Sequence, residues 1–158
     1  AKKFKNLEVI NRPKKLSTSS SSSIDAINHA IDKIRYTGNV VLLQPTSPLR
    51  IDKDILTAIN LLKKGKSPLM SVCKSVHDIS LMTIKSPEDQ KFKKINKKKS
   101  PVYFPNGAIY AAHSEWLKKN ATFHSNKTYM YLMPQERSID IDYEYQFVAS
   151  ECLLRNRK

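Results

Sequence analysis

The apolar positions along the chain follow two periods, which predict helices and strands in turn. Isoleucines recur every three or four positions over residues 23–35, as on the buried face of an amphipathic helix, with Ser22 or Ser23 as its N-cap. The same period predicts a second helix over residues 51–65, capped by Asp52. Two further helices are expected, over residues 114–120 and 142–156.

Short apolar runs bounded by Gly, Pro and Asn predict strands. The run Asn39–Leu43 is apolar without alternation, as in a strand that is buried on both faces. Asn106-Gly107 divides residues 102–112 into two strand-like pieces, which is the pattern of a hairpin tip. The remaining strands are expected over residues 6–12, 67–74, 79–85, 128–133 and 137–142.

The order of these elements predicts an α/β fold. Strands that are apolar on both faces and alternate with helices are typical of a Rossmann-like, mostly parallel sheet flanked by helices. The later hairpin-like pieces predict a small antiparallel extension of that sheet. At 158 residues the chain has the length of a single domain, residues 1–158, and it contains no internal repeat.

The net charge is strongly positive, with 28 Lys and Arg against 14 Asp and Glu, a balance of +14. Such a charge favours polyanionic partners, although a lysine-rich surface without any partner has the same composition. No zinc-ligand spacing or nucleic-acid-binding motif accompanies the charge, so a nucleic-acid partner is not expected. No apolar run reaches the roughly 20 residues that span a bilayer, so no membrane partner is expected either.

The two isolated cysteines, Cys73 and Cys152, favour a reducing, cytoplasmic setting.

The stretch that follows the first buried strand carries candidate binding groups. Gln44, Thr46 and Ser47 stand at the carboxyl end of this strand, where ligands bind in open α/β sheets. Pro45 and Pro48 restrict the backbone, so these side chains would form a stiff polar rim. The alternative is an ordinary proline-rich turn whose hydroxyls bond the local backbone.

Asp140 and Asp142 form a second candidate site. On a strand the i, i+2 spacing places both carboxylates on one face, roughly 7 Å apart at the α-carbons. Two like charges at this separation favour a hard cation such as Mg²⁺ between them. The alternative makes Asp142 the N-cap of the last helix and Asp140 a solvated residue at a strand end.

A third candidate is the stretch around Asn106 and Tyr110. The Asn106 amide could face a ligand, or it could belong to a simple turn. Tyr110 shares a strand face with Ala108, so its hydroxyl could equally be a buried group with a local partner.

Taken together, "LLQPTSPLR", "NGAIY" and "MPQERSIDID", in this order, closely resemble the motifs of the CMP-sialic acid synthetase (acylneuraminate cytidylyltransferase) family, which includes the CMP-legionaminic and CMP-pseudaminic acid synthetases. The resemblance runs from about Leu7 to Leu154. It implies a nucleotide-diphospho-sugar transferase fold, a homodimer, and Mg²⁺-dependent transfer of CMP from CTP to a nine-carbon (nonulosonic) sugar acid, with release of pyrophosphate. A bacterial source is expected from the Lys- and Ile-rich composition.

The resemblance also implies roles for individual residues. Asp140 and Asp142 match the catalytic, metal-binding aspartates, and Arg12 and Ser23 match nucleotide contacts. Residues 92–130 correspond to a sugar-site and dimerisation subregion. The residues that match the family's sugar contacts are Gln44, Thr46, Ser47, Asn106, Tyr110 and Phe123.

One family feature has no counterpart in the sequence. The family begins with a Gly-rich, basic phosphate-binding loop, whereas the three glycines here, Gly38, Gly65 and Gly107, are scattered. The chain is therefore expected to lack the N-terminal nucleotide-binding portion, as a fragment or as a natural variant. The alternatives are a non-catalytic relative with the same fold and, on charge alone, a basic nucleic-acid-binding domain.

Overall fold

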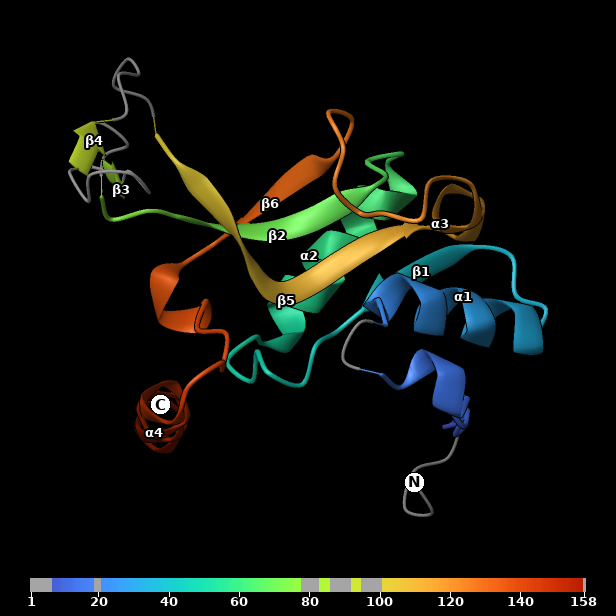
Figure 1. The fold of residues 1–158 in the computed structure, drawn as a ribbon, viewed down its shortest axis with the longest axis horizontal. Helices are drawn as coiled ribbons and strands as arrows, with labels where there is room; N and C mark the ends of the chain where they lie inside the picture. Colours follow the sequence, from blue (N-terminus) through green and yellow to red (C-terminus); the bar gives the residue numbers. More distant parts are fainter. Residues whose placement is uncertain (1–6, 19–20, 78–82, 86–91, 95–100, 158) are drawn as a thin grey trace.

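The computed structural model describes residues 7–18, 21–77, 83–85, 92–94 and 101–157. Helices and strands alternate over most of this part, which confirms the α/β class (Figure 1). The helices are α1 (Ser23–Lys33), α2 (Asp52–Lys63), α3 (Ser114–Asn120) and α4 (Glu144–Arg155), with short 3-10 helices η1 (Lys14–Leu16) and η3 (Gln135–Arg137). The strands are β1 (Asn39–Leu42), β2 (Leu69–Lys74), β3 (Thr83–Lys85), β4 (Phe92–Lys94), β5 (Tyr103–His113) and β6 (Tyr129–Met133).

The main sheet of the described residues has the strand order β1-β5-β2-β6. β2 pairs with β6 in parallel, whereas β5 runs antiparallel to both β1 and β2. The expectation of a mostly parallel sheet is therefore wrong, since two of the three pairings are antiparallel. The apolar pattern indicates that a strand is buried but is the same in either direction, so it could not reveal the reversed course of β5.

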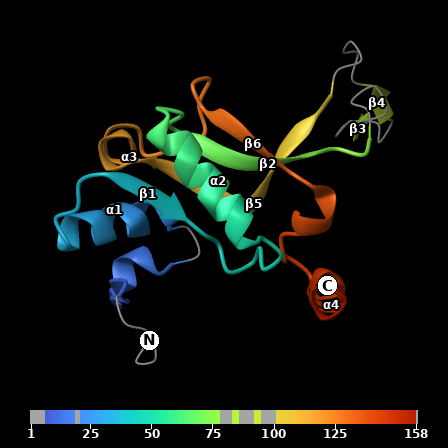
Figure 2. The ribbon, with the colours of Figure 1, turned by 180° about the vertical axis from the view of Figure 1, so that it is seen from behind.

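Both faces of the sheet are covered by helices (Figures 1 and 2). On one face, Ala58 and Leu62 of α2 pack against Ala111 of β5. On the other face, Ile31 of α1 and Leu117 of α3 pack with Ala112. Neighbouring alanines of β5 thus serve opposite layers, as the alternation of side chains along a strand requires.

Capping confirms one predicted helix start and corrects two. The Ser22 hydroxyl accepts a hydrogen bond from Asp25 N (3.1 Å), as expected for the start of α1. At α2 the cap is not Asp52, because the Asp54 carboxylate accepts from Ile51 N (3.0 Å). At α4 the Gln146 side chain accepts from the backbone N–H groups of residues 142 and 143, so the Asp142 carboxylate is not the cap.

Asn106-Gly107 is not a hairpin tip but lies within the continuous strand β5. Met70 pairs with Tyr110, whereas Val72 pairs with Pro105, so β5 carries three more residues than β2 between these two pairs. The extra residues form a bulge, which accommodates the positive φ of Gly107 (+72°). A bulge and a two-residue turn both require a positive φ, which Asn-Gly readily supplies, so the sequence pattern did not distinguish them.

Three of the other predicted strands also need comment. Residues 137–142 and the described residues 7–12 form no strand. Of the strand expected over residues 79–85, only Thr83–Lys85 is described, as β3, which pairs antiparallel with β4. The rest of that prediction lies outside the described residues. Among the described helices, none is both long and apolar enough to cross a membrane.

Candidate active site

The turn that follows β1 is held in place by Arg50. The Arg50 Nη1 donates to the carbonyl oxygens of Gln44 (2.7 Å), Ser47 (2.8 Å) and Ala108 (3.3 Å). Removal from water lowers the pKa of this guanidinium, and three carbonyl dipoles take the place of a carboxylate partner. Arg50 therefore fixes the proline-rich turn against the bulge of β5.

Ser47 connects this turn to the first of the two aspartates. Ser47 is buried, and its Oγ lies 3.3 Å from Asp140 Oδ1 and 3.2 Å from the Asn106 carbonyl oxygen. The backbone confirms the contact, since Ile141 N donates to the Thr46 carbonyl (2.8 Å). Three segments far apart in the sequence meet here: the turn, the bulge and the residues after η3.

Gly107 provides the space that the Asp140 carboxylate occupies. A Cβ added to Gly107 would lie 2.7 Å from Asp140 Cγ and 2.8 Å from Ser47 Oγ, closer than non-bonded carbon atoms approach. The glycine therefore meets two demands, a positive φ and direct contact of a carboxylate with the backbone.

The two aspartates line one cavity of about 490 Å³, together with Phe104, Ser138 and Tyr145. Asp140 is half-buried and Asp142 is exposed. Neither carboxylate forms an ion pair with a Lys, Arg or His of the described residues. Two uncompensated carboxylates beside one cavity, in a chain of net charge +14, suit a hard divalent cation that keeps part of its water shell.

Asn106 lies at the cavity, but its side-chain amide is used inside the protein. The Nδ2 donates to Ser138 Oγ (2.8 Å), and the Oδ1 accepts from Ser71 Oγ (2.6 Å). Ser71 Oγ also accepts from Ile109 N (2.8 Å), so this hydroxyl closes the bulge from β2. The Asn106 amide therefore holds the bulge to Ser71 and Ser138, and both its oxygen and its nitrogen are hydrogen-bonded within the protein.

Tyr110 and Phe123 lie on the other side of β5, in the core between α1 and α3. Their ring centroids are 5.4 Å apart, and Phe123 is only 5% exposed. Burial raises the pKa of the Tyr110 hydroxyl, and the charge of Asp140 raises it further. The charge of Asp140 thus acts on Tyr110, whereas Phe123 is chiefly a core residue in this structure.

The remaining predicted site residues differ in their positions. Gln44 is half-buried and Thr46 is exposed, and the Gln44 amide makes no hydrogen bond with another described residue. Arg12 and Ser23 are both exposed; Arg12 lies before α1, and Ser23 is its first residue. No interaction within the described part connects their side chains to the aspartates.

A buried ionic network that the sequence did not reveal anchors the segment that carries the aspartates. Arg137 binds Asp54 with two hydrogen bonds, from Nε to Oδ2 (3.0 Å) and from Nη2 to Oδ1 (2.9 Å). The Tyr131 hydroxyl also donates to Oδ1 (2.8 Å). Burial opposes ionisation of Asp54, but the hydrogen bonds from Arg137, Ile51 N and Tyr131 outweigh it and lower the pKa of the carboxyl. The only sequence signal was Arg137 within "QERSIDID".

Comparisons with known proteins show which proteins the chain resembles in sequence. An N-acylneuraminate cytidylyltransferase of Escherichia coli is 31% identical over 86% of this chain, and one of Streptococcus agalactiae serotype V is 28% identical over 91%. A CMP-N,N'-diacetyllegionaminic acid synthase of Legionella pneumophila is 29% identical over 90%. No protein-family model matches the chain.

The matches cover unequal shares of these relatives. The chain spans about a third of the length of the two N-acylneuraminate cytidylyltransferases, 34% and 37%, and 67% of the legionaminic acid synthase. The similarity nevertheless extends over almost the whole of the chain itself. The resemblance inferred from the three motifs is therefore confirmed: the chain is similar to N-acylneuraminate cytidylyltransferases and to a CMP-N,N'-diacetyllegionaminic acid synthase.

Proposed function

We propose that this chain is a cytidylyltransferase that joins CTP to a nonulosonic sugar acid and releases pyrophosphate. The observation that carries the proposal is the contact of Ser47, Gly107 and Asp140 beside the cavity that Asp140 and Asp142 line. The names of the similar proteins support the same reaction class.

Asp140 and Asp142 would hold a Mg²⁺ ion, since their carboxylates lack a described cationic partner. When bound, the ion supplies charge neutralisation for the phosphate groups of the nucleotide. The chain's own residues position the metal-binding carboxylate: Ser47 donates toward Asp140 or the Asn106 carbonyl and so helps to orient the carboxylate.

The half-buried Gln44, whose amide has no described partner, would present that amide to the sugar acid. Placement of reacting groups rather than covalent catalysis is what a phosphoryl transfer of this kind demands.

Further proposals about the whole protein follow from the resemblance. We propose a homodimer, and the exposed Met130 and Leu132 on the edge strand β6 provide apolar surface that a second copy would cover. A cytoplasmic location is proposed because both cysteines, Cys73 and Cys152, are free.

The reaction is tested by measuring pyrophosphate release from CTP with N-acetylneuraminic acid or N,N'-diacetyllegionaminic acid in the presence of Mg²⁺. When the chain is assayed together with a phosphate-binding N-terminal portion, we expect turnover with at least one acid and a fall of roughly 100-fold or more in Asp140→Asn, because a metal ligand is lost. Asp52→Asn is the matched control, since Asp52 is an exposed carboxylate on α2 outside the cavity. No release with either acid, or full activity of Asp140→Asn, would contradict the proposal.

A further inference from the structure

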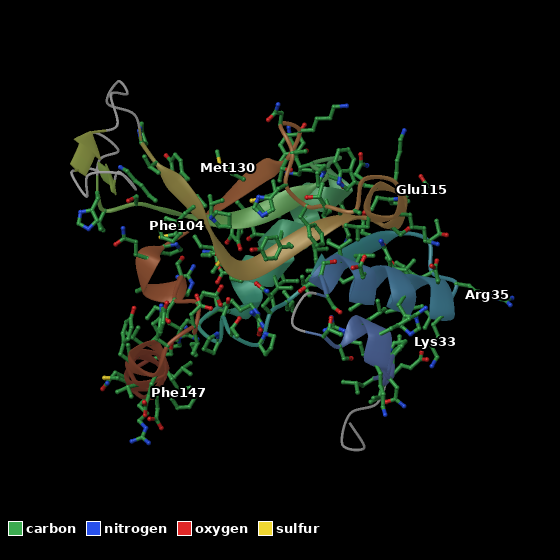
Figure 3. All side chains as sticks on the ribbon, viewed as in Figure 1. Lys33, Arg35, Phe104, Glu115, Met130 and Phe147 are labelled. Carbon is green, nitrogen blue, oxygen red and sulfur yellow. The ribbon has the colours of Figure 1, made fainter. Side chains whose placement is uncertain are left out.

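A second cavity, of about 710 Å³, lies at the other end of β5 from the aspartates. It is formed between α3 and the segment that follows it, and it includes His113, the last residue of β5. His113 lies six positions after Gly107, which corresponds to about 20 Å along a strand. Figure 3 shows this separation: Phe104 lines the aspartate cavity, and Glu115, on α3 at the far end of the sheet, lines the second one. The two cavities are therefore distinct.

The second cavity carries positive charge that the described part of the protein does not neutralise. Lys119 and Lys127 line it, and neither forms an ion pair with a described carboxylate. Lys118, the neighbour of Lys119, pairs instead with Asp32 at 2.5 Å and does not line the cavity. Among the described lining residues the one carboxylate is that of Glu115, whose Oε2 lies 3.8 Å from His113 Nδ1.

The carbonyl groups at the end of α3 would repel an anion, but two of them are already bonded. Asn120 Nδ2 donates to the Trp116 carbonyl (3.0 Å), and Ala121 N donates to the Leu117 carbonyl (2.9 Å). The Trp116 indole N–H donates to the Thr122 carbonyl (2.8 Å), which fixes the ring as a wall of the cavity. The local field is thus dominated by the lysines rather than by the helix terminus.

A smaller basin of about 450 Å³ extends this cavity toward β6. The two share Ser67, Asn126 and Lys127 in their linings. At the far side the Lys66 ammonium lies 4.6 Å from the centroid of the Tyr129 ring, and Tyr129 lines the smaller basin. A third cation thus lies near a groove that already offers amide and hydroxyl donors.

We propose that this groove binds a small anion that carries phosphate or carboxylate groups, at a site separate from the proposed catalytic centre. Lys119 and Lys127 would bind the charged oxygens, and the Asn126 amide and Ser67 hydroxyl would supply neutral donors. Charge-assisted hydrogen bonds of this kind are the strong ones in anion recognition. The two lysines stand on different elements, so an anion between them would join α3 to the segment before β6.

Trp116 makes the site directly observable, because it is the only tryptophan in the chain and it lines the cavity. We would titrate the protein with tripolyphosphate and with citrate in metal-free buffer and follow tryptophan fluorescence. A saturable change is expected with at least one probe, and comparison of the two distinguishes phosphate from carboxylate. Lys119→Gln and Lys127→Gln should each weaken binding about five- to tenfold, because a charge-assisted hydrogen bond is lost.

Lys118→Gln is the matched control, since it removes the same charge from α3 outside the cavity. Binding to this variant should stay within about twofold of the wild type. A fluorescence response that is absent with both probes would overturn the proposal. So would an equal loss in the Lys118→Gln and Lys119→Gln variants, which would show a diffuse effect of charge. Asp140→Asn should leave the response unchanged, and its loss in that variant would assign the anion to the other cavity.

Discussion

Gly107→Ala is expected to destabilise the fold by about 2 to 5 kcal/mol and to displace the Asp140 carboxylate. An alanine at the φ of +72° costs about 1 to 2 kcal/mol. Its Cβ would also overlap Asp140 Cγ and Ser47 Oγ, and such overpacking costs about 1 to 3 kcal/mol more. Urea unfolding monitored by circular dichroism measures the loss of stability.

Gly65→Ala separates the two causes. Gly65 has a similar φ of +77°, but no atom lies within 4 Å of the position of its Cβ. This control should therefore lose only the backbone contribution, about 1 to 2 kcal/mol. We also expect turnover to fall about 100-fold in Gly107→Ala and to be retained in Gly65→Ala, because only the first moves a proposed metal ligand. Equal losses of stability and activity in the two variants would show that Asp140 does not rest against Gly107.

Arg137→Met should destabilise the protein by about 3 to 5 kcal/mol, because it leaves Asp54 without its cationic partner. The Asp54 side chain is 1% exposed, whereas that of Arg137 is 22% exposed. Arg155→Met is the matched control: Arg155 pairs with Glu151 across one helical turn at the surface, and its loss should cost no more than about 0.5 kcal/mol. If both variants lost the same stability, the buried network would not anchor the segment that follows it.

The same pair predicts how this loss depends on pH. The folded-state pKa of Asp54 lies below its ordinary value of 3.8, so its stabilising contribution is present above that pH and is lost as the pH falls through the folded pKa. In Arg137→Met, protonation of Asp54 also removes the penalty of a buried unpaired charge. The difference in unfolding free energy between wild type and Arg137→Met should therefore narrow as the pH falls from 7 to 3. A difference that is constant between pH 7 and pH 3 would contradict this assignment.

The sequence predicted the elements of the fold better than their pairing. Ser22 and the spaced isoleucines were sufficient to predict α1, because capping and helical periodicity depend only on residues that are close in sequence. The antiparallel course of β5 arises from its pairing with β1 and β2, and its bulge is bonded by Ser71 of β2, which is distant in sequence from Asn106. A polar residue within the apolar run of β2 was the only local sign of this contact. The segment 137–142 has an alternating pattern but pairs with no strand of the described residues, so alternation alone was misleading.

The candidate site was predicted from motifs, not from periodicity. The contact of Ser47 with Asp140 brings two of the three motifs together. The roles of Arg50 and Asp54 could not be identified from the sequence, because each depends on a partner that is brought near only by folding. Arg50 bonds backbone carbonyl groups, and Asp54 bonds Arg137. Asn106 was expected to face the sugar acid, yet its buried amide is bonded to Ser71 and Ser138, a difference that only the bulge explains.

The central claim is that Asp140 and Asp142 together hold a divalent cation, and binding of Mn²⁺ tests it most directly. Electron paramagnetic resonance distinguishes free Mn²⁺ from bound ion without requiring turnover. The wild-type chain and Asp52→Asn should both bind Mn²⁺ saturably, whereas the double variant Asp140→Asn/Asp142→Asn should not. Equal Mn²⁺ binding by the double variant and the wild type would contradict the claim.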